Sequence, residues 1–382
     1  MRTLLLIGVL AIATAAQAQK QEPVKLAGTP KAEVLAAATK LADQVRGGRF
    51  PHVVRRDPAL AQQFLWLAAT HAEPEVVAAS LEGMSRTFSR RAHKDRATVD
   101  ENYRAVVRAR LASTAGAVQR HALRAARQIM GDDKVDLATL DGVLALATGG
   151  SPAARIEAIR ALTNVRDFQL PKARPGEIKA KVVKAIASDL SHADTAVVAV
   201  ALDRLARSAY PDLPMRDALM TQARTLMAST EPAVRGNALI LLGRLGKPGD
   251  GKVLGAEMVK AMGDSSPFVR AQAAEAAAAL KHRPAIHAIA RLLDDAAGTR
   301  VEMKPYKDLE GKSQRLRLQP DGGVRVDEAA IYALQLMTEG DASAERFKAP
   351  SIAGRDREPR RSKAVAQAKA WYAARKDKIA AE

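Results

Sequence analysis

The sequence predicts an all-α protein, an α-solenoid of stacked antiparallel helix pairs. Aromatic residues make up only 3% of the 382 residues, and Ala and Leu dominate the 47% that are hydrophobic. That balance favours helices and argues against a large β core. One pattern of residues also recurs at intervals of 35 to 43 residues. Periods of this length are typical of stacked helix pairs.

The first eighteen residues, 1–18, have the form of a secretory signal peptide. Arg2 precedes the apolar run Leu4–Ala13, and Ala16–Ala18 has the small-x-small form that a signal peptidase accepts. The run is too short to span about 30 Å of hydrocarbon. A buried first helix or a membrane anchor is the alternative. We expect cleavage near Ala18 and a periplasmic or secreted protein, and the absence of cysteine excludes disulfides and a lipid-modified cysteine.

A linker and a capping helix are predicted for residues 19–57. The helix is Pro30–Arg46, where apolar residues recur at helical spacing. Asp57 followed by Pro58 is a typical helix start, a capping carboxylate before a proline at the first helical position. The solenoid is predicted to run over residues 58–338.

The clearest copy of the repeat begins at Pro232. The residues two, six and ten positions after this proline are apolar or small, and they trace one face of a helix. No repeat can bury such a face alone, so neighbouring repeats must stack. The helix starts that share the pattern are Pro74, Gly116, Pro152, Thr195, Pro232, Pro267 and Val324. The partner helices are expected at Asp136–Ala147, Glu177–Leu190, Arg216–Met227 and Lys252–Met262.

Two copies carry a resemblance to a known family. Thr230–Arg235 and Asp264–Arg270, each followed by small or apolar residues, resemble HEAT repeats of the short bacterial type also seen in phycobilisome-lyase-like proteins. The resemblance covers roughly Pro58–Thr338 and implies a solenoid. It also implies that the arginine three residues after the proline pairs with a turn acid of its own or a neighbouring repeat. The structural positions of the repeat are Pro152, Arg155, Pro232, Arg235, Asp264, Pro267 and Arg270.

An insertion is predicted at residues 296–323, because the interval before Val324 is longer than the others. Alternating residues flank Gln319–Gly323, in which Pro-Asp-Gly favours a turn. We therefore expect a β-hairpin with Arg315–Leu318 and Val324–Val326 as its strands. A mobile basic loop is the alternative, since two isolated strands are marginally stable.

Residues 339–382 are predicted to form a linker and a C-terminal capping helix. Phe347–Arg361 is rich in proline, glycine and charge, which indicates an exposed linker. Ser362–Ile379 returns to helical spacing and resembles the closing helix of bacterial HEAT proteins. We expect it to dock Trp371 over the last repeat. A helix that binds a partner is the alternative.

Catalytic and metal-binding motifs are not evident in the sequence. The seven histidines are isolated and none is followed by Glu, so the His-Glu ligand pairs of the HEAT-type deoxyhypusine hydroxylases are missing. Gly311–Ser313 matches only the end of a phosphate loop, with Tyr306 where the leading glycine belongs. The pairs Asp132-Asp133 and Asp294-Asp295 fall at helix ends, where carboxylates cap N–H groups. We predict no catalytic residue, no metal site and no cofactor.

The strongest functional feature is basic. The formal net charge is +18, and basic proteins attract polyanions. Arg120, Arg124 and Arg127 are spaced to share one helix face. The candidate basic strip consists of Arg86, Arg90, Arg91, Arg120, Arg124 and Arg127. The alternative is an ordinary solvated surface.

Together these features predict an exported, non-enzymatic scaffold that binds a partner in the cell envelope. A protein partner is expected first, and an anionic polymer or membrane surface second. The signal peptide and the lack of interleaved aromatic residues argue against nucleic acid, and no small-molecule substrate is evident. The alternative is a HEAT-type enzyme or enzyme subunit, lyase-like or nucleic-acid-processing.

Overall fold

The computed structural model describes the chain between Pro58 and Ala381 with gaps. The described residues are 58–87, 96–130, 136–163, 175–208, 214–247, 250–318, 325–338 and 357–381. The predictions that lie outside them are the signal peptide, the linker and capping helix of residues 19–57, the turn at 319–323, the repeat anchor Val324, the acidic pair Asp132-Asp133, and Arg90 and Arg91.

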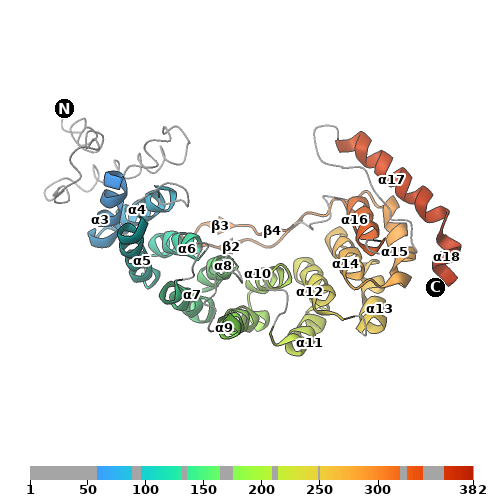
Figure 1. Cartoon of the computed structure of the whole chain (residues 1–382), viewed down its shortest axis with the longest axis horizontal. Coiled ribbons are helices and arrows are strands. Elements are labelled where there is room, and N and C mark those ends of the chain that lie inside the picture. The colour runs from blue at the N-terminus through green and yellow to red at the C-terminus, as the bar shows by residue number, and fades with distance from the viewer. Residues whose placement is uncertain are drawn as a thin grey trace. The chain divides into compact units, whose positions relative to one another are not determined.

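The predicted fold class is confirmed, since helices form nearly all of the regular structure (Figure 1). Their bounds are α3 Pro58–Thr70, α4 Pro74–Thr87, α5 Arg96–Leu111, α6 Gly116–Ile129, α7 Leu137–Gly149, α8 Pro152–Leu162, α9 Pro175–Ser188, α10 Thr195–Ala206, α11 Arg216–Leu226, α12 Pro232–Leu245, α13 Gly251–Ala261, α14 Pro267–Ala279, α15 Ile286–Arg291, α16 Val326–Thr338, α17 Arg357–Ala373 and α18 Lys376–Ala381.

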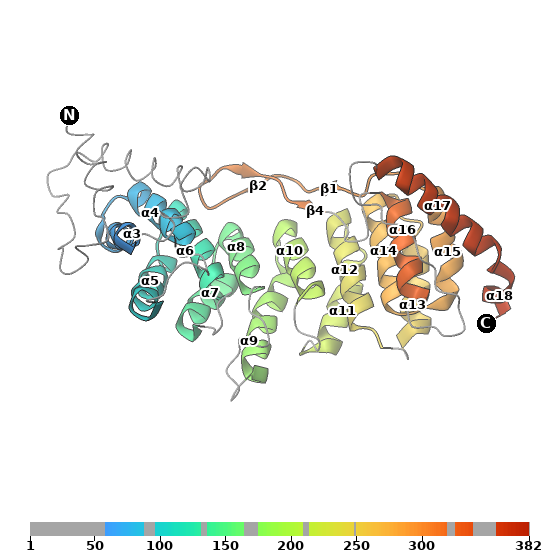
Figure 2. The ribbon, with the colours of Figure 1, turned by 45° about the horizontal axis from the view of Figure 1, so that its top comes forward.

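The helices form two compact units. The first holds the described residues up to Ile178 together with Lys307–Ser313, and the second holds Lys179–Tyr306 and the described residues from Gln314 onward. Within the first unit α4, α6 and α8 pack one against the next, with α3, α5 and α7 as their partners (Figure 2). Within the second unit α10, α12, α14 and α16 pack in the same manner, and α11, α13 and α15 each pair with the helix that follows.

The repeat pattern marks where these helices begin. Six of its anchors, Pro74, Gly116, Pro152, Thr195, Pro232 and Pro267, are the first residues of α4, α6, α8, α10, α12 and α14. Ser151 and Asp194 cap two of these starts, their side chains accepting N–H bonds from Ala154 (3.3 Å) and Ala196 (2.8 Å). Each cap satisfies a backbone donor that the first helical turn leaves open.

Small side chains fill much of the core between the helices, and a row of hydrogen-bonded amide side chains crosses it. Ala199, Ala238 and Ala274 are fully buried on α10, α12 and α14. Asn237 donates to the carbonyl oxygen of Ala199 (3.0 Å), and Gln272 donates to the side-chain oxygen of Asn237 (3.3 Å). Because buried polar groups need partners, this chain of amides disfavours sliding of the three helices past one another.

The insertion contains two short sheets, which confirms that a β-hairpin is present. Strand β1 (Val301–Glu302) pairs with β4 (Arg317–Leu318), and β2 (Tyr306–Lys307) pairs with β3 (Ser313–Gln314). The β1–β4 pair is antiparallel, with Val301 opposite Leu318.

The predicted partners of these strands were nevertheless wrong. Leu318 pairs with Val301 and not with Val324–Val326, and Val326 is the first residue of α16. The chain reverses near Gly311, whose φ of +73° favours glycine. Met303 and Leu316 are both buried, and the N–H of Met303 donates to the carbonyl of Leu316 at 3.0 Å. Burial of this pair explains why the strands meet at this register.

The C-terminal helix begins earlier than predicted. Helix α17 starts at Arg357, inside the segment expected to be an exposed linker, and ends at Ala373. Its docked side carries Arg361, Ala364 and Ala368, all buried. Arg361 forms an ion pair with the buried Glu328 of α16 at 3.3 Å, which explains why the helix extends to this residue.

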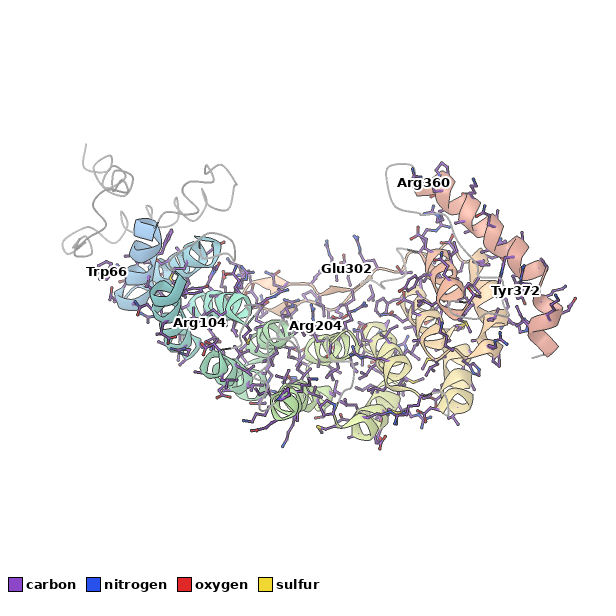
Figure 3. All side chains as sticks on the ribbon, viewed as in Figure 1. Trp66, Arg104, Arg204, Glu302, Arg360 and Tyr372 are labelled. Atoms are coloured by element: carbon purple, nitrogen blue, oxygen red, sulfur yellow. The ribbon has the colours of Figure 1, made fainter. Side chains whose placement is uncertain are left out.

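Near its C-terminal end, α17 makes a polar contact through Tyr372, labelled in Figure 3. The hydroxyl of Tyr372 lies 2.7 Å from Nδ1 of His287 on α15. The expected anchor, Trp371, is half-buried, and the guanidinium of Arg375 lies 5.5 Å from the centre of its ring. The helix therefore packs on α15 and α16 mainly through small residues and polar contacts.

Candidate functional site

Helix α6 carries the candidate site because its two faces differ sharply. One face is apolar and buried, and it consists of Val118, Ala122, Leu123, Ala125, Ala126 and Ile129. The other face carries Arg120, Arg124 and Arg127, which the helical period places in one row. Arg124 and Arg127 are exposed, whereas Arg120 is half-buried. The rest of the predicted basic strip stays a prediction. Arg86 lies in α4 but its side chain is not described, and Arg90 and Arg91 fall outside the described residues.

The seven residues Lys307–Ser313, here called the acidic turn, belong to the same unit as α6. The turn is held by its own hydrogen bonds. The carboxylate of Asp308 accepts the N–H groups of Glu310 (3.0 Å) and Lys312 (2.9 Å), and the N–H of Gly311 donates to the carbonyl of Asp308 (2.9 Å). This segment includes the Gly311–Ser313 run that matches the end of a phosphate loop. In the structure this run is part of a tight turn between two strands.

Arg120 is the point where the acidic turn meets α6. Its guanidinium hydrogen-bonds Glu310 and lies 3.8 Å from the carboxylate of Asp308. The backbone of Leu309 also packs directly on Gly116, at the first residue of α6, where a Cβ atom would overlap the carbonyl oxygen. Sequence reasoning found the arginine but missed its partners. The only sequence signal was the Asp-x-Glu spacing within the insertion.

The ionisable groups around this contact shift one another's pKa values. Hydrogen bonds from Lys312 and Arg120 hold the pKa of Glu310 below its usual value, although partial burial opposes them. Burial lowers the pKa of His121 to about 4, with Arg124 and Arg120 adding to the shift and Glu82 and Glu310 opposing it. At neutral pH the carboxylate of Glu310 is therefore ionised, whereas the imidazole of His121 is neutral.

The repeat arginines have structural partners in the second unit. Arg235 binds both carboxylate oxygens of Asp264, at 3.0 and 2.8 Å. Arg270 donates to Asp295 at 2.7 Å and to the carbonyl of Asp264 at 2.8 Å. The turn of one repeat is thereby tied to the first helical turn of its neighbour.

Arg155, the corresponding arginine in the first unit, binds backbone oxygens instead. It donates to the carbonyls of Gly150 (2.9 Å) and Ala147 (3.2 Å), at the end of α7. These contacts satisfy carbonyl groups that a helix end leaves without an intrahelical partner.

Groups that could support catalysis or bind a metal are sparse in the described residues. No cluster of three or more His, Asp or Glu side chains there is arranged to hold a metal ion. His71 and His192 accept backbone N–H bonds from Glu73 (3.1 Å) and Asp194 (3.0 Å), in the turns before α4 and α10. None of the helices in the described residues is both long enough and apolar enough to cross a bilayer.

The comparison with protein families finds one match. Residues 220–303 match the model of HEAT repeats. The match covers the end of α11 and runs through α12, α13, α14 and α15 to β1, and it includes the Arg235–Asp264 and Arg270–Asp295 pairs. The family resemblance is therefore confirmed for this segment. The comparison with curated proteins found no match.

Solved structures with similar folds include engineered and natural proteins. A crystal structure described as an engineered protein is 21% identical, with 58% of this chain and 93% of that chain covered and a TM-score of 0.43. The karyopherin Kap121p, bound to the extreme C-terminus of the protein phosphatase Cdc14p, is 12% identical, with 83% and 35% covered and a TM-score of 0.49. Importin beta is also 12% identical, with 83% and 41% covered and a TM-score of 0.48.

Proposed function

We propose that this protein is an exported, non-enzymatic scaffold whose HEAT-like surface binds a partner in the cell envelope. The row of arginines on α6 is the observation that carries this proposal. Arg124 and Arg127 are exposed on a helix whose opposite face is fixed in the core. Charges held in register on a packed helix bind without first ordering the backbone, which lowers the entropic cost of association.

Protein is the partner that this arrangement favours. Among the described residues, Arg120 pairs with two carboxylates from a polypeptide turn, those of Asp308 and Glu310. Arginine recognises carboxylates through charge-assisted hydrogen bonds. An anionic polymer or an anionic membrane surface would use the same charges, and the sequence leads us to propose a location outside the cytoplasm for all three partners.

The first prediction concerns retention on an immobilised polyanion. The triple variant Arg120→Ser, Arg124→Ser and Arg127→Ser should elute from heparin at clearly lower salt than the wild type, because binding that neutralises several charges is strongly salt-dependent. Its circular dichroism should be unchanged. Elution at the wild-type salt concentration would contradict a role for the α6 row.

A charge-matched variant separates the site from bulk charge. Arg315 and Arg317 lie beside Glu302, labelled in Figure 3, and Arg300 is exposed in the same insertion. Replacing these three arginines with Ser removes the same net charge and should leave elution close to that of the wild type. Crosslinking and pull-down from the envelope fraction would then identify the partner, and N-terminal sequencing of the mature protein would test cleavage after Ala18.

A further inference from the structure

The acidic turn has the properties of a ligand already seated on α6. The turn is held by its own hydrogen bonds, since the side chain of Asp308 accepts two N–H bonds within it and Gly311 supplies the left-handed residue. A turn organised in this way presents Asp308 and Glu310 together, on either side of Leu309. The pair forms a small, preorganised carboxylate unit of the form Asp-x-Glu.

The surface that receives the turn is equally specific. Gly116 leaves room for the backbone of Leu309. The start of α6 has no side-chain cap, because Ala115 occupies the capping position. Carboxylates near a helix N-terminus are stabilised by the helix dipole, and Arg120 adds a full positive charge. Shape and charge thus select an acidic turn at this position.

The basic row continues beyond the part that the acidic turn covers. Arg124 and Arg127 follow Arg120 by one and two turns of the same face. Burial and the charge of Arg120 lower the pKa of Arg124, and Glu157, Glu82 and Glu310 of the acidic turn oppose this shift. A longer acidic segment that binds Arg120 would extend along the same helix face to Arg124 and Arg127.

We infer that α6 forms a docking site for an acidic Asp-x-Glu turn of a partner protein, and that the chain's own acidic turn occupies this site until the partner displaces it. The inference rests on the proposed function and adds the chemistry of the partner and a means of regulation. Because the intramolecular turn is tethered, it competes at an effective concentration on the order of 1 mM. A partner must therefore gain affinity from contacts to the neighbouring arginines.

The test uses the full-length protein and a labelled peptide. The peptide has the sequence Pro305–Arg315, closed by a disulfide between two added terminal cysteines. In a protein variant with Asp308→Asn and Glu310→Gln, the site should be vacated, and we expect the peptide to bind about tenfold more tightly or better than to the wild type. Fluorescence anisotropy measures the dissociation constants. A peptide carrying the same Asn and Gln replacements should not bind.

A second pair of variants tests the surface that receives the turn, without changing any charge. Added to the Asn/Gln variant, Gly116→Ala places a methyl group where the backbone of Leu309 packs, so it should block the peptide as well as the chain's own turn and abolish the gain in affinity. Gly149→Ala is the matched control, because a Cβ atom there meets no other atom within 4 Å. Adding Arg120→Ser to the Asn/Gln variant should abolish the gain.

The outcomes separate this inference from the proposed function. Equal peptide affinity in the wild type and the Asn/Gln variant would overturn the inference, and so would absence of binding in both or a gain that survives Gly116→Ala. If heparin retention still depends on the α6 row in those cases, the scaffold function stands without the competing turn. If only heparin retention rises when the turn is disabled, the site recognises an anionic polymer and the protein-partner inference fails.

Discussion

At the scale of the residue, arginine has two roles in this chain. Arg235 and Arg270 pair with the acids of neighbouring turns, which holds successive repeats together. Arg120 pairs with acids that lie some 190 positions away in the sequence. The repeat pattern predicts the first kind of contact because the spacing is regular. It does not predict the second, since nothing local relates α6 to the insertion.

His121 gives a prediction at this scale. Burial lowers its pKa from 6.5 to about 4, so the folded first unit holds the imidazole neutral among Glu82, Arg120, Arg124 and Glu310. The unfolded chain binds a proton at higher pH than the folded chain, and the free energy of unfolding should therefore fall as the pH drops from 6.5 towards 4.

The measurement is the pH dependence of unfolding in urea. The variant His121→Gln carries no titrating group at this position and should lose less stability than the wild type between those two pH values. A pH dependence identical to that of the wild type would show that His121 does not contribute. Glu310 should add its own loss below its usual pKa of 4.5, because its pKa is also lowered in the folded state.

Among the elements, the sequence located the repeat helices and their first residues better than it located the strand partners and the start of the C-terminal helix. Alternation around Pro-Asp-Gly suggested the wrong partner for Arg315–Leu318, because apolar alternation does not specify which strand is the partner. The start of α17 was not predicted, because the high charge of Arg357–Arg361 is typical of an exposed segment. Only the tertiary structure shows that Glu328 is buried and takes Arg361 into the interface.

The attachment of α17 provides the prediction at this scale. Arg361→Ala leaves Glu328 buried without this cation, and the loss of one partner from a buried ion pair costs about 3–5 kcal/mol. Helix α17 should then detach, and hydrogen exchange of its amide groups should become much faster. Lys369→Ala, which removes an exposed pair with Asp294, should cost less than about 1 kcal/mol and leave exchange unchanged. Equal exchange in the two variants would contradict the importance of the buried pair.

At the scale of the whole molecule, the two compact units lead to a prediction about unfolding. In a solenoid each repeat is stabilised by its neighbours, so separate units can unfold separately. Leu123→Ala in the first unit and Leu242→Ala in the second each remove a fully buried side chain, and each should cost about 2–5 kcal/mol. We expect each substitution to shift a different transition.

The two tryptophans allow the units to be followed one at a time. Trp66 lies in α3 of the first unit and Trp371 in α17 of the second, and the chain contains no other tryptophan. In single-tryptophan variants, Leu123→Ala should move the urea midpoint reported by Trp66, and Leu242→Ala the midpoint reported by Trp371. Equal shifts at both reporters would indicate one cooperative unit.

The all-α class, the period and the starts of the repeat helices can be predicted from the sequence, because they follow from local rules: helix propensity, proline at the first turn and the helical spacing of apolar residues. The sequence also placed Arg120, Arg124 and Arg127 on one face. Only the tertiary structure decided what lies on that face. The contact of Asp308 and Glu310 with Arg120 depends on how a distant turn packs against Gly116, and packing between remote segments leaves no periodic signal in the sequence.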